Sequence, residues 1–143
     1  MIRAGETFTL PRDMGRDDAL AYWFEPGHQV FVYSNDGGIL GTYFLHTNAG
    51  GGGSHVANCG YVTSESATGQ GVARAMCSHS LELARELDYR AIQFNFVVAT
   101  NDRAVRLWES FGFEVAGRLT GAFNHPRHGY VDALVMFRTL GSS

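Results

Sequence analysis

The stretch Thr68-Gly69-Gln70-Gly71-Val72-Ala73 joins a strand-like run that ends near Thr63 to the best helix-like run of the chain. Glycine has no side chain, so the backbone can turn sharply there and come close to a ligand. The first turn of a helix leaves N–H groups without intrahelical partners and carries roughly half a positive charge. This turn can therefore hold a phosphate without a lysine, although glycines before a helix also serve as plain tight connections.

The helix after this turn is predicted to be amphipathic. Residues suited to a buried face recur at three- and four-residue steps, the spacing of one side of a helix. The predicted stripe is Val72, Ala75, Met76, His79, Leu83 and Leu87. A histidine on such a stripe, here His79, is more often a hydrogen-bonded core residue than a catalyst.

A strand, a second helix and two more strands are expected downstream. Ala91–Val98 is a nearly continuous apolar run, typical of a strand covered on both faces. Asn101 can cap the second helix, and Gly112 stands where helices commonly end in left-handed geometry. The stripe of that helix is Ala104, Leu107, Trp108 and Phe111. The last strands are expected over Phe113–Thr120 and Tyr130–Thr139.

Upstream of the turn, three strand-like runs read as an antiparallel meander. They cover Gln29–Ser34, Ile39–Thr47 and His55–Thr63, and a short helix is expected over Arg16–Phe24. The order of strands, helix, strand, helix and strands predicts an α/β (α+β) fold with a mixed sheet and packed helices. A length of 143 residues suits a single domain, 1–143.

Composition excludes several classes of function. Apolar residues make up 45% and charged residues 17% of the chain, as in a folded soluble protein, and the net charge of -3 provides no basic footprint for nucleic acid or an anionic membrane. No run approaches the ~20 apolar residues of a membrane span. We therefore expect neither nucleic acid nor membrane as partner. With only two cysteines and no disulfide framework, we expect a cytoplasmic protein.

Metal binding is not expected. The two cysteines, Cys59 and Cys77, lack the paired spacing of a zinc site. His125-Pro126-Arg127-His128 offers one short pair of imidazoles without a nearby carboxylate, which is usually a polar loop.

Two motifs carry a resemblance to a known family. The stretch from Thr68 to Ala73 resembles motif A of the GCN5-related N-acetyltransferases (GNAT), Arg or Gln, two residues, Gly, one residue, Gly or Ala, and departs from it at Thr68. Asn101 to Phe113 is similar to the family's N-x-x-A-x-x-L-Y-x-x-x-G-F segment. The resemblance implies a mixed, mostly antiparallel central sheet with helices on both faces and splayed strands at an acetyl-CoA cleft. The family's first strand and helix would be shortened or absent before Asp18.

The resemblance also implies which residues bind acetyl-CoA as co-substrate. Backbone groups of Tyr61, Val62 and Thr63 would hold the pantetheine arm, and Asn101 would meet the same part. The pyrophosphate would be held by Gly69, Gln70, Gly71, Val72, Ala73 and Arg74. Trp108 replaces a tyrosine that protonates the leaving sulfur in many relatives, and would pack against the cofactor or the core.

Two strand asparagines are candidates for the acceptor site. Asn58 and Asn95 interrupt apolar strands, so both amides are expected to be largely removed from water, where an unsatisfied amide costs about 1–3 kcal/mol. Each could simply tie down backbone, or together they could bind a small polar ligand. The segment Ser54–Tyr61 and its context resemble the fungal azetidine-2-carboxylate and proline-analogue N-acetyltransferases. This implies catalytic roles: Asn58 orients the acceptor, and Asn95 contacts its amine or the thioester oxygen.

The sequence thus predicts an acetyl-CoA-dependent N-acetyltransferase for a small amino acid or imino acid, working by direct transfer. No general base stands out among Glu65, His55, His125 and His128. Cys59 has no visible paired base, which disfavours an acyl-enzyme. The alternatives are acetylation of a protein N-terminus or a drug amine, or a silent acyl-CoA-binding module. The resembling enzymes suggest a homodimer.

Overall fold

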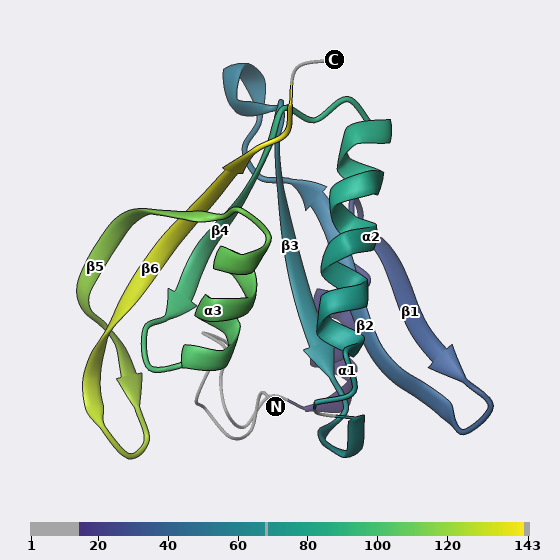
Figure 1. Ribbon diagram of the computed structural model, residues 1–143, viewed down its shortest axis with the longest axis horizontal. Coiled ribbons are helices and arrows are strands. Elements are labelled where there is room, and N and C mark those ends of the chain that lie inside the picture. The colour runs from purple at the N-terminus through teal and green to yellow at the C-terminus, as the bar shows by residue number, and fades with distance from the viewer. Residues whose placement is uncertain (1–14, 68, 142–143) are drawn as a thin grey trace. The chain divides into compact units, whose positions relative to one another are not determined.

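The computed structural model describes residues 15–67 and 69–141 (Figure 1). They form two compact units, one of residues 22–93 with 139–141 and the other of residues 15–21 with 94–138. We call the first the meander unit and the second the α3 unit, and describe each by itself. Thr68, the first residue of the predicted phosphate turn, lies outside the described residues. So does the segment 1–14, most of the region before Asp18 in which the family's first strand and helix were expected to be shortened or absent.

The meander unit begins with three antiparallel strands, as predicted. They are β1 (Gln29–Asn35), β2 (Gly38–Thr47) and β3 (Val56–Thr63), with β1 paired to β2 and β2 paired to β3. Before them lies α1 (Arg16–Trp23), whose last two residues belong to this unit. A short 3-10 turn, Gly51–Gly53, lies between β2 and β3.

Helix α2 (Val72–Glu86) packs along β2 and β3 (Figure 1). It starts at the predicted residue, but its buried face differs from the predicted stripe. The buried residues are Val72, Met76, Cys77, Ser80, Leu81 and Ala84. His79 is exposed and Leu87 is 40% exposed, so placing them on the core face was wrong.

Close approach explains this change of face. A Cβ built on Gly41 of β2 would lie 2.8 Å from Cγ1 of Val72 and 3.0 Å from Cε of Met76, so the helix lies against a strand position without a side chain. Cys77, Ser80 and Ala84 are each fully buried. Small residues let α2 lie near the sheet. The predicted stripe was drawn mainly from larger apolar residues and therefore left these small ones out.

Strand β4 (Ala91–Val98) has the bounds predicted from its apolar run. It pairs in parallel with β3 through Val56↔Ala91 and Ala57↔Ile92. It passes from the meander unit into the α3 unit after Gln93. There it lies beside β6 (Gly129–Thr139), which pairs antiparallel with β5 (Glu114–His125).

The strand order through β4 is β1-β2-β3-β4-β6-β5. The described residues thus form a mixed, mostly antiparallel six-stranded sheet with three α-helices, which confirms the predicted fold class. That the whole chain is one domain stays a prediction. Among the described helices, none has both the length and the apolar character needed to cross a membrane.

In the α3 unit, helix α3 (Asp102–Ser110) follows the predicted capping scheme. The Asn101 side chain accepts a hydrogen bond from the Ala104 N–H at 3.4 Å, and Gly112 has a φ of 87° just beyond the helix. Arg138 of β6 donates to the carbonyl of Phe111 at 2.6 Å. This contact satisfies an acceptor at the helix end.

Strand β5 is longer than predicted and ends at His125 rather than Thr120. Its register with β6 shifts between Leu119 and Phe123, where Gly121 has a φ of 60°. Asp132 of β6 holds this bulge, because its carboxylate accepts from the Gly121 N–H and from Arg118, both at 2.9 Å. The glycine that ended the predicted strand is a bulge inside it.

Candidate active site

The turn before α2 has the backbone geometry that its glycines suggest. Gly69 and Gly71 have φ angles of 85° and 78°, the left-handed region in which glycine is favoured. Gly71 is the N-cap residue, supplies no side-chain cap, and no acidic residue lies in the first turn. The positive end of the helix dipole is therefore not neutralised by a carboxylate from its own first turn.

The side chains around this turn are mostly directed to water. Gly69, Gln70, Gly71 and Arg74 are exposed, whereas the Val72 side chain is 2% exposed and belongs to the core. A Cβ at Gly69 or Gly71 would meet nothing within 4 Å. Open space beside an uncapped helix N-terminus suits a bulky anionic group.

Strand β3 leads into this turn and is paired with β2 along its length. Its pairing with β2 runs from Thr47↔Ala57 to Gly41↔Thr63, and its pairing with β4 consists of Val56↔Ala91 and Ala57↔Ile92. The Tyr61 hydroxyl lies 2.7 Å from Oγ of Ser80, which donates to the Cys77 carbonyl at 2.7 Å. The Tyr61 ring is thus held against α2. The backbone of β3 up to Thr63 is extended, and an extended ligand can pair with backbone of this kind.

Asn58 lies where β3 and β4 stop pairing. Its Nδ2 donates to the carbonyl of Gln93 at 2.9 Å, and its Oδ1 lies 2.9 Å from Nε2 of His46, the residue opposite on β2. The side chain is half-buried. The amide therefore links β2, β3 and β4, as a purely structural asparagine would. Its nitrogen still has one N–H, and its oxygen one lone pair, for a further hydrogen bond.

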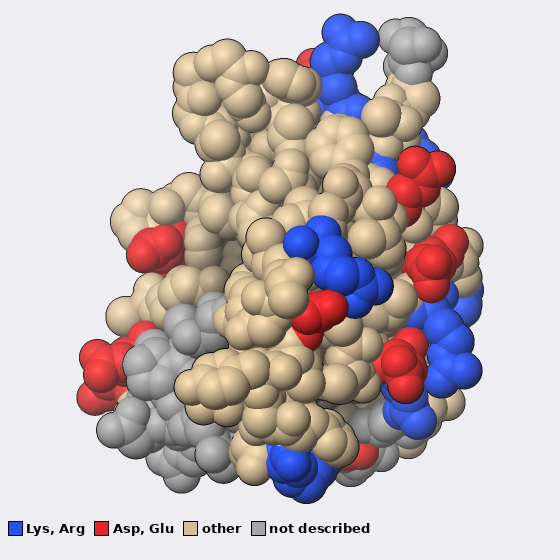
Figure 2. Space-filling view, turned by 90° about the vertical axis from the view of Figure 1, so that its left-hand side faces the viewer, with Lys and Arg blue, Asp and Glu red and all other residues tan. Residues whose placement is uncertain are grey.

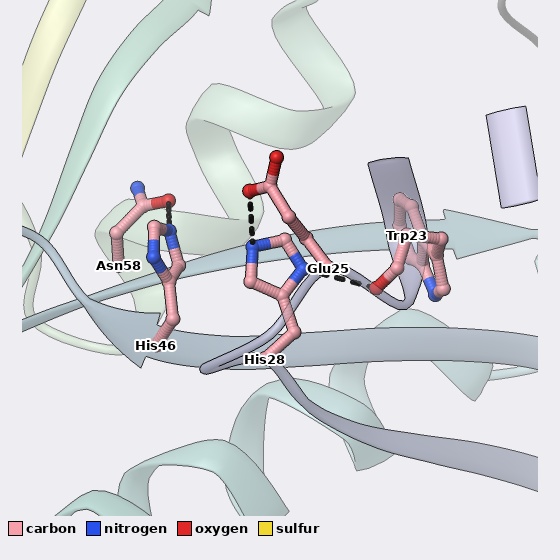
Figure 3. A network of polar contacts seen from close by, with 5 residues as sticks. All are labelled: Trp23, Glu25, His28, His46 and Asn58. Carbon is pink, nitrogen blue, oxygen red and sulfur yellow. Dashed lines mark hydrogen bonds and ion pairs between the residues drawn. The ribbon is translucent and has the colours of Figure 1, made fainter. Parts of the chain in front are cut away.

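His46 belongs to a larger group of polar contacts in the meander unit (Figure 3). Its ring centroid is 4.6 Å from that of His28, whose Nδ1 lies 2.9 Å from the Trp23 carbonyl oxygen. Nε2 of His28 is 3.7 Å from the exposed carboxylate of Glu25. Burial lowers the pKa of His46 and the neighbouring His28 acts in the same direction, which together outweigh the opposing effects of the Asn58 hydrogen bond and the Glu25 charge.

The sequence pointed to Asn58 but missed its partners. His46 could have been found by aligning the β2 and β3 patterns, since it faces Asn58 directly in the register. Glu25 and His28 come from the turn after α1, whose path no local pattern specifies.

In the α3 unit, Asn95 departs from expectation. It is exposed, so the prediction that both strand asparagines are largely removed from water is wrong for it. Ala91 and Val97, on the same face of β4, are buried, but Gln93 is half-buried and Asn95 exposed between them. The reading of β4 as covered on both faces therefore fails in mid-strand.

Trp108 is a core residue of the α3 unit. It is 8% exposed, and its ring lies 4.8 Å from Phe94 and 6.3 Å from Phe113, which stack on each other at 4.4 Å. This packing matches one of its two expected roles. Asn101, the other predicted cofactor contact in this unit, already uses its side chain as the α3 cap.

The predicted site residues are thus divided between the units. Asn58 and the two predicted cofactor segments, 61–63 and 69–74, lie in the meander unit, and Asn95, Asn101 and Trp108 lie in the α3 unit. Within the described residues, no three His, Cys, Asp or Glu side chains are grouped so as to hold a metal ion. On the face drawn in Figure 2, basic and acidic side chains are scattered, with no continuous basic area.

Cys59 is poorly suited to nucleophilic catalysis. The thiol is 7% exposed, and burial raises its pKa to about 12. The thiolate is the reactive form of cysteine, so this residue is almost entirely unreactive at neutral pH. The buried hydroxyl of Tyr43, 2.5 Å from Nδ1 of His79, likewise has its pKa raised by burial.

Comparison with known proteins assigns the class. The sequence matches the acetyltransferase (GNAT) family over residues 3–113, which is most of the chain. The protein therefore belongs to the GNAT family of N-acetyltransferases.

Individual relatives agree with this assignment. N-acetyltransferase aca1 of Schizosaccharomyces pombe is 29% identical over 151 residues, covering 94% of this chain and 72% of the relative. A GCN5-related N-acetyltransferase from Kribbella flavida superposes with a TM-score of 0.91 at 40% identity, covering 97% of this chain and 85% of that one. The yncA protein of Salmonella typhimurium, solved with its cofactor acetyl-CoA, has a TM-score of 0.81 at 19% identity, covering 96% of this chain and 80% of that one, and supports the fold alone.

Proposed function

We propose that the protein transfers an acetyl group from acetyl-CoA to the amine of a small amino acid or imino acid, of the proline-analogue type, by direct transfer. The observation that carries this proposal is the turn before α2, where two left-handed glycines open onto an uncapped helix N-terminus at the end of β3. Family membership supports acetyl-CoA as the donor.

The meander unit fits the charged part of this donor. Backbone N–H groups over Gly69–Arg74 would hold the pyrophosphate, helped by the helix dipole and by an open approach. The Gln70 N–H is the exception, because it donates to the Ala67 carbonyl at 3.1 Å. Val72 contributes only its backbone, since its side chain is in the core. The edge of β3 toward Thr63 would pair with the pantetheine arm.

Acetyl-CoA would supply a thioester whose carbonyl carbon forms a bond to the nitrogen of a neutral amine. The carbon–sulfur bond then breaks, coenzyme A leaves as the thiolate, and the amine nitrogen gives up its proton to solvent. Asn58 would orient the acceptor through the N–H and the oxygen lone pair that its contacts leave unused. Asn95, exposed on β4, would donate to the oxygen on which negative charge develops. In both roles the asparagine side chain only forms hydrogen bonds, and neither side-chain amide takes up a proton.

Direct transfer is favoured over an acyl-enzyme because the only cysteine near Asn58 in the sequence, Cys59, has a raised pKa. The position of the tyrosine seen in relatives holds Trp108, whose indole is no acid. An ordinary thiol pKa of about 8.5 makes the departing thiolate moderately stable, so solvent can supply its proton.

Trp108 also favours a second candidate, a catalytically silent acyl-CoA-binding module. Acetylation of a protein N-terminus or a drug amine is a further alternative within the enzymes. The homodimer expected from the resembling enzymes would be checked by sedimentation.

Thiol release from acetyl-CoA, measured against a panel of amines, tests the proposal. The panel contains azetidine-2-carboxylate and other proline analogues, primary amino acids, peptides with free N-termini and an aminoglycoside. Turnover with the imino acids is expected, and turnover only with peptides or the aminoglycoside would overturn the acceptor class. Calorimetric binding of acetyl-CoA with no turnover on any amine would favour the silent module.

A further inference from the structure

His46 and Asn58 form a hydrogen-bonded pair whose proton positions follow from the atoms around them. The Gln93 carbonyl can only accept, so the atom of Asn58 that faces it, at 2.9 Å, must be the amide nitrogen. The amide oxygen then faces Nε2 of His46, also at 2.9 Å. An oxygen that only accepts requires a hydrogen on that nitrogen, so neutral His46 carries its proton on Nε2.

The same reasoning applies to His28. Its Nδ1 lies 2.9 Å from the Trp23 carbonyl oxygen, so Nδ1 carries a hydrogen. The side chain is 3% exposed and stacks on Phe44 with ring centroids 4.1 Å apart and planes 11° apart. Stacking and the backbone hydrogen bond hold the His28 ring next to His46, with the two ring centroids 4.6 Å apart.

These contacts restrict the Asn58 amide to one orientation. Rotation by 180° would put the amide NH2 against the Nε2–H of His46 and the amide oxygen against the Gln93 carbonyl, which loses both hydrogen bonds. In the observed orientation, Asn58 keeps one N–H and one oxygen lone pair for a ligand. One donor beside one acceptor complements an amino acid, whose carboxylate accepts and whose amine donates.

We propose that His46, braced by His28, is a positioning residue that holds Asn58 in the orientation that binds the acceptor. This rests on the acceptor role proposed for Asn58 above. His46 need not touch the acceptor, and its contribution is the Nε2–H donor. Any side chain that places an N–H at the same point would serve.

Two substitutions of His46 distinguish the effect of its Nε2–H donor from the effect of its ring shape. His46→Gln can place an amide N–H near the position of Nε2, and His46→Leu cannot donate. With an imino-acid acceptor, His46→Leu is expected to lower kcat/KM for the acceptor by about tenfold, one hydrogen bond's worth. His46→Gln should stay within about threefold of wild type, and the KM for acetyl-CoA should change by less than about twofold in both.

Thr47→Val is the matched control. Thr47 lies next to His46 on β2, and its hydroxyl makes a 2.6 Å contact with the hydroxyl of Tyr89 rather than with the side chain of His46 or Asn58. The substitution should leave the acceptor kinetics unchanged. Equal defects in His46→Gln and His46→Leu, or a defect in Thr47→Val as large as in His46→Leu, would overturn the proposal.

An NMR measurement tests the pair without any acceptor. Long-range nitrogen–proton correlations should show the Nε2–H form of His46 at neutral pH, and the Asn58 side-chain NH2 signals should shift in His46→Leu but not in Thr47→Val. A His46 proton on Nδ1, or Asn58 signals indifferent to His46→Leu, would refute the positioning role. If this arm succeeds while no amine is acetylated, the proposed function fails and the pairing stands.

Discussion

His46 on β2 and Asn58 on β3 face each other across an antiparallel register and are joined by a 2.9 Å contact at the point where β3 loses its pairing with β4. Cross-strand neighbours on one face of a sheet are the closest side-chain pairs that a sheet offers. This pair joins β2 to β3 next to the Ala57↔Ile92 pairing of β3 with β4. Asn58 keeps one N–H and one oxygen lone pair beyond these contacts.

The proposed function assigns two distinct recognition elements to the meander unit. One is made of backbone, where the glycines before α2 leave the helix N-terminus open. The other is made of side chains around Asn58 (Figure 3). In the proposed function, the first would hold the pyrophosphate of acetyl-CoA and the second would orient the acceptor amine.

Gly71→Asp is expected to weaken acetyl-CoA binding by about tenfold relative to Gly71→Asn, because only Asp adds a negative charge beside the pyrophosphate. The two side chains have nearly equal size and both tolerate the left-handed φ of 78° at this position. Calorimetry at low and high salt measures the difference, which should shrink as salt rises. Equal affinities in the two folded variants would place the pyrophosphate elsewhere.

Asn95→Ala is expected to lower kcat on the order of a hundredfold with little change in acetyl-CoA affinity, since its proposed contact forms with the reacting oxygen. The side chain is exposed, so the free energy of unfolding should change by less than about 0.5 kcal/mol. Single-turnover kinetics together with calorimetry check both parts. An unchanged kcat would remove Asn95 from the mechanism.

Cys59→Ala is expected to retain turnover within about threefold, at a cost in stability of about 1 kcal/mol, because its buried thiol is not a nucleophile. In the wild type, burial holds the pKa of this thiol at about 12, so iodoacetamide should not label it in the folded protein at neutral pH. Mass spectrometry of native and urea-unfolded samples measures labelling. An acetylated Cys59 trapped after mixing with acetyl-CoA would establish the acyl-enzyme route instead.

The lowered pKa of His46 predicts a loss of stability in mild acid. The unfolded chain takes up a proton near the ordinary histidine pKa of about 6.5, whereas the folded chain resists protonation until a lower pH. The unfolded state binds more protons in this window, so the free energy of unfolding falls as pH drops from about 6.5 through the folded pKa.

His46→Gln isolates this contribution, because it keeps a hydrogen-bond donor and cannot titrate. Urea unfolding of both proteins from pH 7.5 to 5 should show a steeper decline for the wild type. Parallel curves would mean that the His46 pKa is the same in the folded and unfolded states.

Local patterns were enough for most elements of the fold. The bounds of β4 and the start of α2 agree with those predicted, because an unbroken apolar run and a glycine pair before an amphipathic run are both local signals. The Asn101 cap and the left-handed Gly112 are local for the same reason. The GNAT motifs lie in these segments, so the family could be recognised before any tertiary contact was known.

The faces of the elements and the surroundings of the site depended on tertiary structure. The close approach of α2 to Gly41 decided which side of the helix is buried. Asn95 is exposed because the middle of β4 is not covered on that face. His28, His46 and Asn58 meet through strand register and the path of a turn. Sequence separation carries no information on such contacts, because side chains distant along the chain become neighbours only when the strands have paired.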